Sequence, residues 1–218
     1  MEITHIGHDS FKIKGKNLSL VIDPYNPKIG YSFPKQSAQI LLLTNPKGEF
    51  SYPQGVIDHK LVVRTPGEYE ISNVFIYGVR VHPKNDNTAV NGRRDTIYLI
   101  EIDGVSILHL GALGYEPSKE TLEKISSVDV LMIPVGGGKS LDAEAASKVI
   151  SSLEPGLVIP MHYKTPDLTG ISDLSGVDKF LEEMGAEQSV RKEDKLKIGS
   201  RSDIPEDDTQ VVILKQHH

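Results

Sequence analysis

Four histidines stand at or just after the ends of apolar, strand-like segments of the chain. The first segment leads into a Gly-His-Asp-Ser turn that contains His8, and later segments lead to His82, His109 and His162. Strand ends can meet at one edge of a sheet, and neutral imidazole is a common metal ligand. A histidine taken singly is more often a hydrogen-bonded structural residue. The pattern therefore indicates metal chemistry only where several of these histidines converge.

Other kinds of active site find little support in the sequence. The chain of 218 residues has no cysteine, which excludes disulfides, thiolate metal sites and cysteine nucleophiles. It also lacks the Gly-x-Ser-x-Gly segment that presents the nucleophile of many serine hydrolases. The segment Gly136–Ser140 resembles a phosphate-binding loop, but Ile133 stands where that pattern requires its first glycine. We interpret the segment as a tight turn at the edge of a sheet.

Charge and length narrow the class of protein further. With 24 basic and 30 acidic residues, the net charge of −6 disfavours nucleic acid as a partner. No apolar run approaches the roughly 18 residues of a membrane span, and Met1–His5 does not begin a signal peptide, so we expect no membrane association and a cytoplasmic protein. The length suits a single domain over residues 1–216. His217 and His218 resemble the start of an expression tag and are set apart.

The elements that must position these residues form a β-rich first half and an alternating second half. Strands are predicted at residues 1–6, 10–13, 19–22, 40–43, 60–63, 74–81, 96–102, 105–110, 128–135, 157–161 and 211–214. Helices are predicted at residues 118–126, 142–153 and 174–184, and polar loops at 194–208. Continuous apolar runs such as Ile40–Leu43 are typical of strands covered on both faces, so layers of sheet and helix are expected.

Read together, these segments resemble the metallo-β-lactamase-fold hydrolases, and within them the branch of ascorbate-phosphate lactonase-like proteins. The matching motifs follow the family's order over nearly the whole chain: Met1–Phe11, Val21–Tyr25, Pro66–Ile71, Thr96–Gly104, His109–Gly111, Ile133–Gly137 and Ile159–Tyr163. The resemblance implies an α/β (α+β) fold, a four-layer αββα sandwich of two mixed β-sheets flanked by helices. It also implies two metal ions, usually zinc and sometimes manganese, at one edge.

The metal ligands that the resemblance implies are largely replaced. The family's Thr/Ser-His-x-His-x-Asp-His motif corresponds to Thr44–Phe50, and its bridging aspartate corresponds to Ala112. Four ligand positions therefore hold unsuitable side chains: Asn45, Lys47, Phe50 and Ala112. The remnant ligands are His82, His162 and the carboxylate of Glu49. Because a catalytic zinc needs three good protein ligands, we expect no tightly bound zinc or manganese and no other cofactor.

The expected function is accordingly a non-catalytic or binding homologue of metal-dependent hydrolases, a pseudoenzyme with a small molecule in the former active-site cleft. No catalytic residue is assigned, and the cleft candidates are Asn45, Lys47, Glu49, Ala112 and Tyr163. The alternative is an active hydrolase of the lactonase or phosphoester type, with one zinc or manganese held by His82, His162 and Glu49. Two interpretations of Lys47 stay open: its ammonium replaces a lost ion beside Glu49, or its loop has drifted and the side chain points to solvent.

Overall fold

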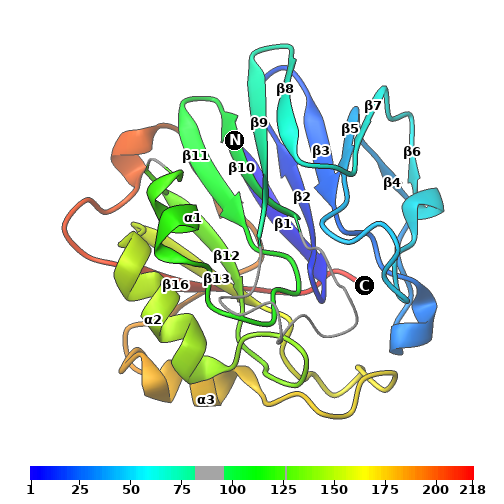
Figure 1. Cartoon of the computed structure of the whole chain (residues 1–218). Coiled ribbons are helices and arrows are strands. Elements are labelled where there is room, and N and C mark those ends of the chain that lie inside the picture. Colours follow the sequence, from blue (N-terminus) through cyan, green and yellow to red (C-terminus); the bar gives the residue numbers. More distant parts are fainter. Residues whose placement is uncertain (82–95, 126) are drawn as a thin grey trace.

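Two mixed β-sheets packed face to face form the body of the protein (Figure 1). The structure is a computed structural model that describes residues 1–81, 96–125 and 127–218. One sheet has six strands in the order β15 (Leu196–Lys197), β1 (Glu2–Gly7), β2 (Ser10–Lys14), β3 (Ser19–Ile22), β5 (Ile40–Leu42) and β7 (Leu61–Val63). The other has eight, in the order β14 (Arg191–Glu193), β16 (Gln210–Leu214), β13 (Leu157–Met161), β12 (Val130–Pro134), β11 (Val105–His109), β10 (Thr96–Ile102), β9 (Val74–Arg80) and β8 (Gly67–Ile71).

Strand alternation divides the apolar side chains between the layers. Along β5, Ile40 and Leu42 face the core between the two sheets, whereas Leu41 faces the outer side of the six-stranded sheet. Along β12, Met132 enters the same central core, whereas Leu131 packs on the helix side. Both strands are therefore apolar at every position because both of their faces are buried.

Helices cover the outer face of the eight-stranded sheet: α1 (Lys119–Glu123), α2 (Ala143–Leu153) and α3 (Val177–Glu183) (Figure 1). The side chain of Asp142 caps α2 by accepting a hydrogen bond from the backbone N–H of Ala145. Apolar residues of α2 and α3, among them Val149 and Phe180, then pack with the outward-facing residues of the sheet. This packing completes the helix–sheet half of the expected sandwich.

The outer face of the six-stranded sheet is covered in a different way. Here the described chain supplies loops, the short 3-10 helices η1 (Pro27–Ile29) and η2 (Pro53–Gly55), and a small sheet of β4 (Gln36–Ser37) and β6 (Val56–Ile57). An aromatic cluster of Tyr25, Tyr31 and Phe33 packs edge to face within this layer. The predicted fold is confirmed, but its fourth layer is mostly irregular chain.

The predicted elements agree closely with the observed ones. All the predicted strands are present, with ends that differ by a few residues, and β4, β6 and β8 are strands that were not predicted. Three further segments are also more ordered than expected. These are β14, where no strand was predicted, and β15 and the 3-10 helix η5 (Arg201–Asp203), both in the predicted loop at 194–208. The helix predicted at 118–126 is shorter, ending with Glu123.

Strand direction brings several loops to one edge of the sandwich. Strands β3, β5 and β7 pair in parallel, and so do β11, β12 and β13. The carboxyl ends of parallel strands lie at the same edge of a sheet, where ligands of open sheets commonly bind. The turn between β1 and β2 and the loops after β3, β5, β11, β12 and β13 line one cleft there.

The end of the chain folds back against the body. The backbone N–H of His217 donates to the carbonyl of His5, and the ring of His218 stacks on Tyr31. The domain boundary at residue 216 stays a prediction. Among the described residues, we find no helix with the length and apolar character needed to cross a bilayer.

Candidate active site

The cleft has a volume of about 630 Å³ and lies where the sheet edges meet. Its base carries histidine, aspartate and threonine side chains from the strand ends. Its walls are the loop after β5 and the segment after β13. The lining residues that carry ionisable or hydrogen-bonding side chains are His8, Asp9, Asp23, Tyr25, Thr44, Asn45, Lys47, Glu49, Ser51, Lys139, His162, Ser172 and Asp173.

Most of the residues singled out from the sequence line this cleft: Asn45, Lys47, Glu49, Phe50, Ala112 and His162. Tyr163 does not line it, because its ring is buried among apolar residues on the helix side of the sheet. His82 lies outside the described residues, so its part in the site stays a prediction. The placement of these residues in one cleft supports the match between this chain and the family motif at those positions.

Lys47 and Glu49 are both exposed at the mouth of the cleft. Within the part of the chain that the structure describes, no salt bridge joins them. The ammonium of Lys47 thus does not neutralise a buried carboxylate in this arrangement. Of the two interpretations of Lys47, the drifted loop with its side chain directed to solvent agrees better with the structure.

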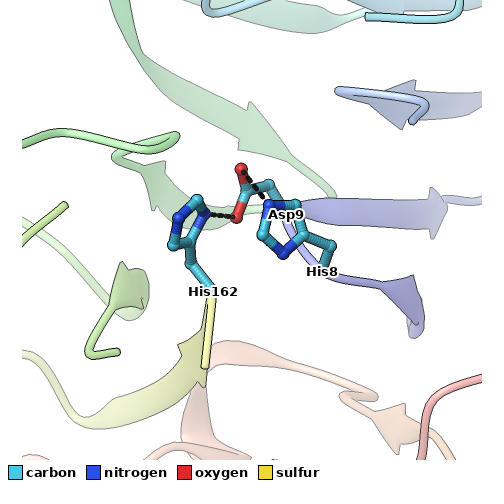
Figure 2. Close-up of side chains that lie close together, drawn as sticks. All are labelled: His8, Asp9 and His162. Carbon is cyan, nitrogen blue, oxygen red and sulfur yellow. Dashed lines mark hydrogen bonds and ion pairs between the residues drawn. The ribbon is translucent and has the colours of Figure 1, made fainter. Parts of the chain in front are cut away.

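A cluster of His8, Asp9 and His162 lies within the cleft, with one ligand atom from each residue within 4.8 Å of the others (Figure 2). His162 Nδ1 donates a 2.7 Å hydrogen bond to Asp9 Oδ1. On the other side, His8 Nε2 lies 3.7 Å from Asp9 Oδ2, too far for a hydrogen bond. The two imidazole rings lie with their centroids 4.1 Å apart and their planes tilted by 37°. Two imidazoles and a carboxylate thus converge from segments 153 residues apart.

The tight turn between β1 and β2 places the first two members of the cluster. Gly7 pairs with Ser10 across the turn, so that His8 and Asp9 form its tip. His8 has a left-handed backbone with φ of 52°, and the preceding Gly7 has φ of 149°, which glycine tolerates best. A Cβ on Gly7 would also lie 2.9 Å from the hydroxyl of Tyr25. The glycine therefore allows the turn that points His8 and Asp9 toward the cleft.

His162 has a left-handed backbone too, with φ of 53°, immediately after β13. Its N–H donates to the carbonyl of His8 at 3.3 Å, and its own carbonyl accepts from Gly136 at 3.1 Å. A Cβ on Gly136 would lie only 2.2 Å from that carbonyl oxygen. The glycine-rich turn after β12 therefore serves close backbone approach to His162. Left-handed residues other than glycine cost energy and gather at functional sites.

His109 hydrogen-bonds the backbone of the turn that carries His8 and Asp9. The N–H of Gly111 donates to His109 Nδ1 at 3.1 Å, so this nitrogen carries the lone pair and the ring proton resides on Nε2. Nε2 then donates to the backbone carbonyl of Asp9 at 2.9 Å. His5 holds the carbonyl of His8 in the same way, at 3.0 Å. His5 and His109 are thus structural residues that fix the backbone of the turn.

Asp23 and Thr44 connect the loops after β3 and β5. Both the N–H and the hydroxyl of Thr44 donate to the Asp23 carboxylate, at 2.8 and 2.6 Å. Asp23 also adopts a left-handed backbone, with φ of 44°. Gly111 packs closely against Thr44, since a Cβ there would lie 2.4 Å from the threonine hydroxyl. This contact fixes the start of the loop that carries Asn45, Lys47 and Glu49.

Burial and charge set the protonation states in the cleft. Burial lowers the pKa of His5, His8 and His109 to about 4, so all three imidazoles are neutral near pH 7. Burial alone would raise the pKa of Asp9, but the neighbouring His162 and His8 hold it below its usual range. The cluster therefore offers an anionic carboxylate beside a neutral imidazole, which are the forms that bind metal ions.

Sequence reasoning missed Asp9 and understated His8. The Gly-His-Asp turn was noted as a chain feature, but the family motif gives it no ligand role. The one signal in the residue types was a carboxylate directly after a histidine in a glycine turn at a strand end. The decisive fact is the contact with His162, which only the packing of β13 near β1 creates.

The residues in the cleft do not fit the two-ion centre implied by the motif. Lys47 bears a permanent cation, and the side chains of Phe50 and Ala112 have no donor atom. A site for a single ion is compatible with the side chains of the cluster. One ligand atom each from His8, Asp9 and His162 lies within 4.8 Å of the others, and two imidazoles with a carboxylate make a known zinc donor set. One ion fits the chemistry of this cluster, and two do not.

The double-sheet sandwich with its edge cleft defines the metallo-β-lactamase class. The chain belongs to the family described as the beta-lactamase superfamily domain, whose model matches residues 2–162. A protein from Thermotoga maritima, provisionally assigned as a Zn-dependent hydrolase of the metallo-β-lactamase superfamily, has a similar crystal structure, with 26% identity and a TM-score of 0.78. The match covers 98% of this chain and 99% of that one.

Two further relatives are more distant. A UPF0173 metal-dependent hydrolase of Carboxydothermus hydrogenoformans is 24% identical over 76% of this chain and 85% of its own. The metallo hydrolase Igni18 from Ignicoccus hospitalis is 17% identical, with a TM-score of 0.62 over 85% of this chain and 90% of its own, and shows likeness of fold alone. The expectation of a pseudoenzyme finds no support here, since relatives are described as hydrolases and a His–Asp–His cluster is present.

Proposed function

We propose that this protein is a metal-dependent hydrolase that cleaves a small molecule in the edge cleft, with a centre reduced to one zinc or manganese ion. The observation that carries the proposal is the convergence of His8, Asp9 and His162 in the cleft. The description of relatives as metal-dependent hydrolases supports the same conclusion. The proposal corresponds to the one-metal hydrolase that the sequence analysis gave as its alternative. It differs in that His8 and Asp9, rather than His82 and Glu49, accompany His162.

An ion held by His8, Asp9 and His162 would, when bound, activate water for attack at neutral pH. The chain itself contributes position and charge. Asp9 keeps its negative charge, and His5 and His109 hydrogen-bond the backbone carbonyls of the turn. At the mouth, Lys47 and Lys139 are exposed and available to an anionic group of a substrate. Hydrolysis of a lactone or a phosphoester is the reaction type proposed.

A hydrolysis panel tests this function directly. The purified chain, reconstituted with zinc or manganese, is offered simple lactones, phosphomonoesters and phosphodiesters. We expect turnover of at least one class, loss of that turnover with a chelator, and loss of roughly 100-fold or more in His162→Ala. Glu187→Gln, an exposed carboxylate outside the cleft lining, is the control and should keep full activity. Absence of turnover across the metal-loaded panel would contradict the proposal for these substrate classes.

A second candidate function, non-catalytic binding of a small molecule, is favoured by Phe50 and Ala112, which line the cleft with apolar side chains. A binding protein would retain ligand affinity after chelation, whereas the hydrolase should lose activity. Thermal-shift screening of small anionic molecules with and without chelator separates the two. Stabilisation that persists without metal, together with no turnover, would favour the binding function.

A further inference from the structure

We propose that the ion is held by His8, Asp9 and His162, and not by the remnant of the family's own ligand set. This inference rests on the proposed one-metal function and specifies its centre. Of the three residues, only His162 coincides with a ligand position implied by the motif. The other two come from the turn between β1 and β2. The metal site would thus have moved toward this turn when the loop after β5 lost its ligands.

The separations within the cluster suit one shared ion. Two atoms bound to the same zinc at about 2.0–2.2 Å stand roughly 3.4 Å apart in tetrahedral geometry. His8 Nε2 and Asp9 Oδ2 are 3.7 Å apart, which is close to that value and longer than a hydrogen bond. His162 Nδ1 and Asp9 Oδ1 are closer, at 2.7 Å, because a proton now joins them. Binding requires this pair to give up the proton and widen by less than 1 Å.

The partners of His8 argue against a purely structural cluster. Its side chain is 4% exposed, and Nδ1 has no hydrogen-bond partner among the described residues. Its Nε2 lies beyond hydrogen-bond length from the Asp9 carboxylate. A buried polar ring that lacks such partners costs free energy. Coordination through Nε2 would give the ring a partner at that nitrogen, which the Asp9–His162 hydrogen bond does not supply.

The backbone around the cluster is fixed before any ion arrives. His109 donates to the carbonyl of Asp9, His5 donates to the carbonyl of His8, and the N–H of His162 donates to that same carbonyl. His8 and His162 are both held in left-handed conformations. A site whose ligands are already oriented loses little conformational entropy on binding, which favours affinity.

Metal binding by the intact, metal-depleted chain tests the assignment. Isothermal titration with Zn²⁺ or Mn²⁺ should give one site per chain, confirmed by elemental analysis after gel filtration. Asp9→Asn keeps the size of the side chain but removes its charge and should weaken binding by about 100-fold. His8→Asn, in which asparagine tolerates the left-handed backbone, is the second variant and should weaken it similarly. Circular dichroism verifies that each variant is folded.

Three matched variants serve as controls. Asp173→Asn changes another carboxylate of the same cleft, and Glu49→Gln removes the carboxylate of the family motif. The double variant His217→Ala/His218→Ala removes the terminal histidines. We expect all three to bind the ion within threefold of the unmodified chain, on the order of the scatter between surface variants. Loss of the ion in Glu49→Gln or in the terminal variant, with retention in Asp9→Asn, would overturn the assignment.

Failure of the assignment is distinguishable from failure of the proposed function. A chain that binds one ion and hydrolyses its substrate while Asp9→Asn and His8→Asn bind normally would overturn the assignment alone. A chain that binds no ion under any of these conditions would overturn both. One ion that is lost in both turn variants and kept in the three controls is the result that supports the assignment.

Discussion

Three buried histidines around the cleft make the stability of the protein depend on pH. Burial lowers the pKa of His5, His8 and His109 from 6.5 to about 4. In the unfolded chain these residues take up protons at a higher pH than in the folded protein. Their stabilising contribution is therefore fully present above pH 6.5 and is lost as the pH falls to 4.

We expect the free energy of unfolding to drop by more than about 3 kcal/mol between pH 7 and pH 4, since one pKa unit corresponds to about 1.4 kcal/mol per group. Urea unfolding at half-unit steps, with a chelator present to exclude metal effects, measures this. NMR titration of the imidazole C–H signals gives the individual pKa values. Histidines that all protonate near pH 6.5 in the folded protein would show that the rings are not buried as described.

Thr44 provides a second residue-level prediction. Its hydroxyl donates to Asp23 at 2.6 Å, and the residue is buried. Thr44→Val keeps the shape but removes this donor, so we expect a loss of about 1–3 kcal/mol in the free energy of unfolding. Thr44→Ser keeps the hydroxyl and should retain most of the stability. Equal losses in the two variants would mean that the methyl group, and not the hydrogen bond, matters.

At the scale of elements, the turn after β12 controls the position of His162. A Cβ on Gly136 would lie 2.2 Å from the His162 carbonyl oxygen, so the Gly136→Ala chain must move one of the two segments. We expect a loss of about 1–3 kcal/mol in stability and weaker metal binding. Gly176→Ala is the control, because a Cβ there meets nothing within 4 Å. Thermal unfolding and metal titration of both variants decide the matter.

The sequence predicted the elements whose physics is local. Apolar runs such as Val130–Pro134 can be recognised without knowledge of their neighbours, and Asp142 marks the start of α2 by its capping side chain. The strands β14 and β15 escaped prediction because they are short and polar. They form by pairing with β16 and β1, which are contacts that no local pattern encodes.

The sequence placed most of the candidate site residues that the structure describes in one cleft, but it did not indicate the contact between Asp9 and His162. The loop after β5, Ala112 and His162 were placed in one cleft from the motif order, as the structure has them. The role of Asp9 depends on a hydrogen bond to a residue 153 positions away. Such a contact follows from the packing of two sheets, so the residue types alone did not indicate Asp9 as a neighbour of His162.

At the scale of the whole molecule, the two packed sheets form the frame from which the loops of the cleft extend. The central core between the sheets holds the strand ends in place, and the cleft residues follow from where those strands stop. A frame of this kind can lose the ligands of one loop and still bring other side chains to the same edge. Replacement of the family motif therefore does not by itself remove the chemistry of the cleft.

The metal content of the unmodified protein tests this account most directly. Protein purified without chelator from cells supplied with zinc and manganese is passed through gel filtration and measured by elemental analysis. The account predicts one ion per chain, and its loss from the folded His162→Ala variant. Two ions per chain would contradict it by restoring the two-metal centre that the residues do not fit. A chain that carries no ion, and takes up none when zinc or manganese is added in excess, would contradict it as well.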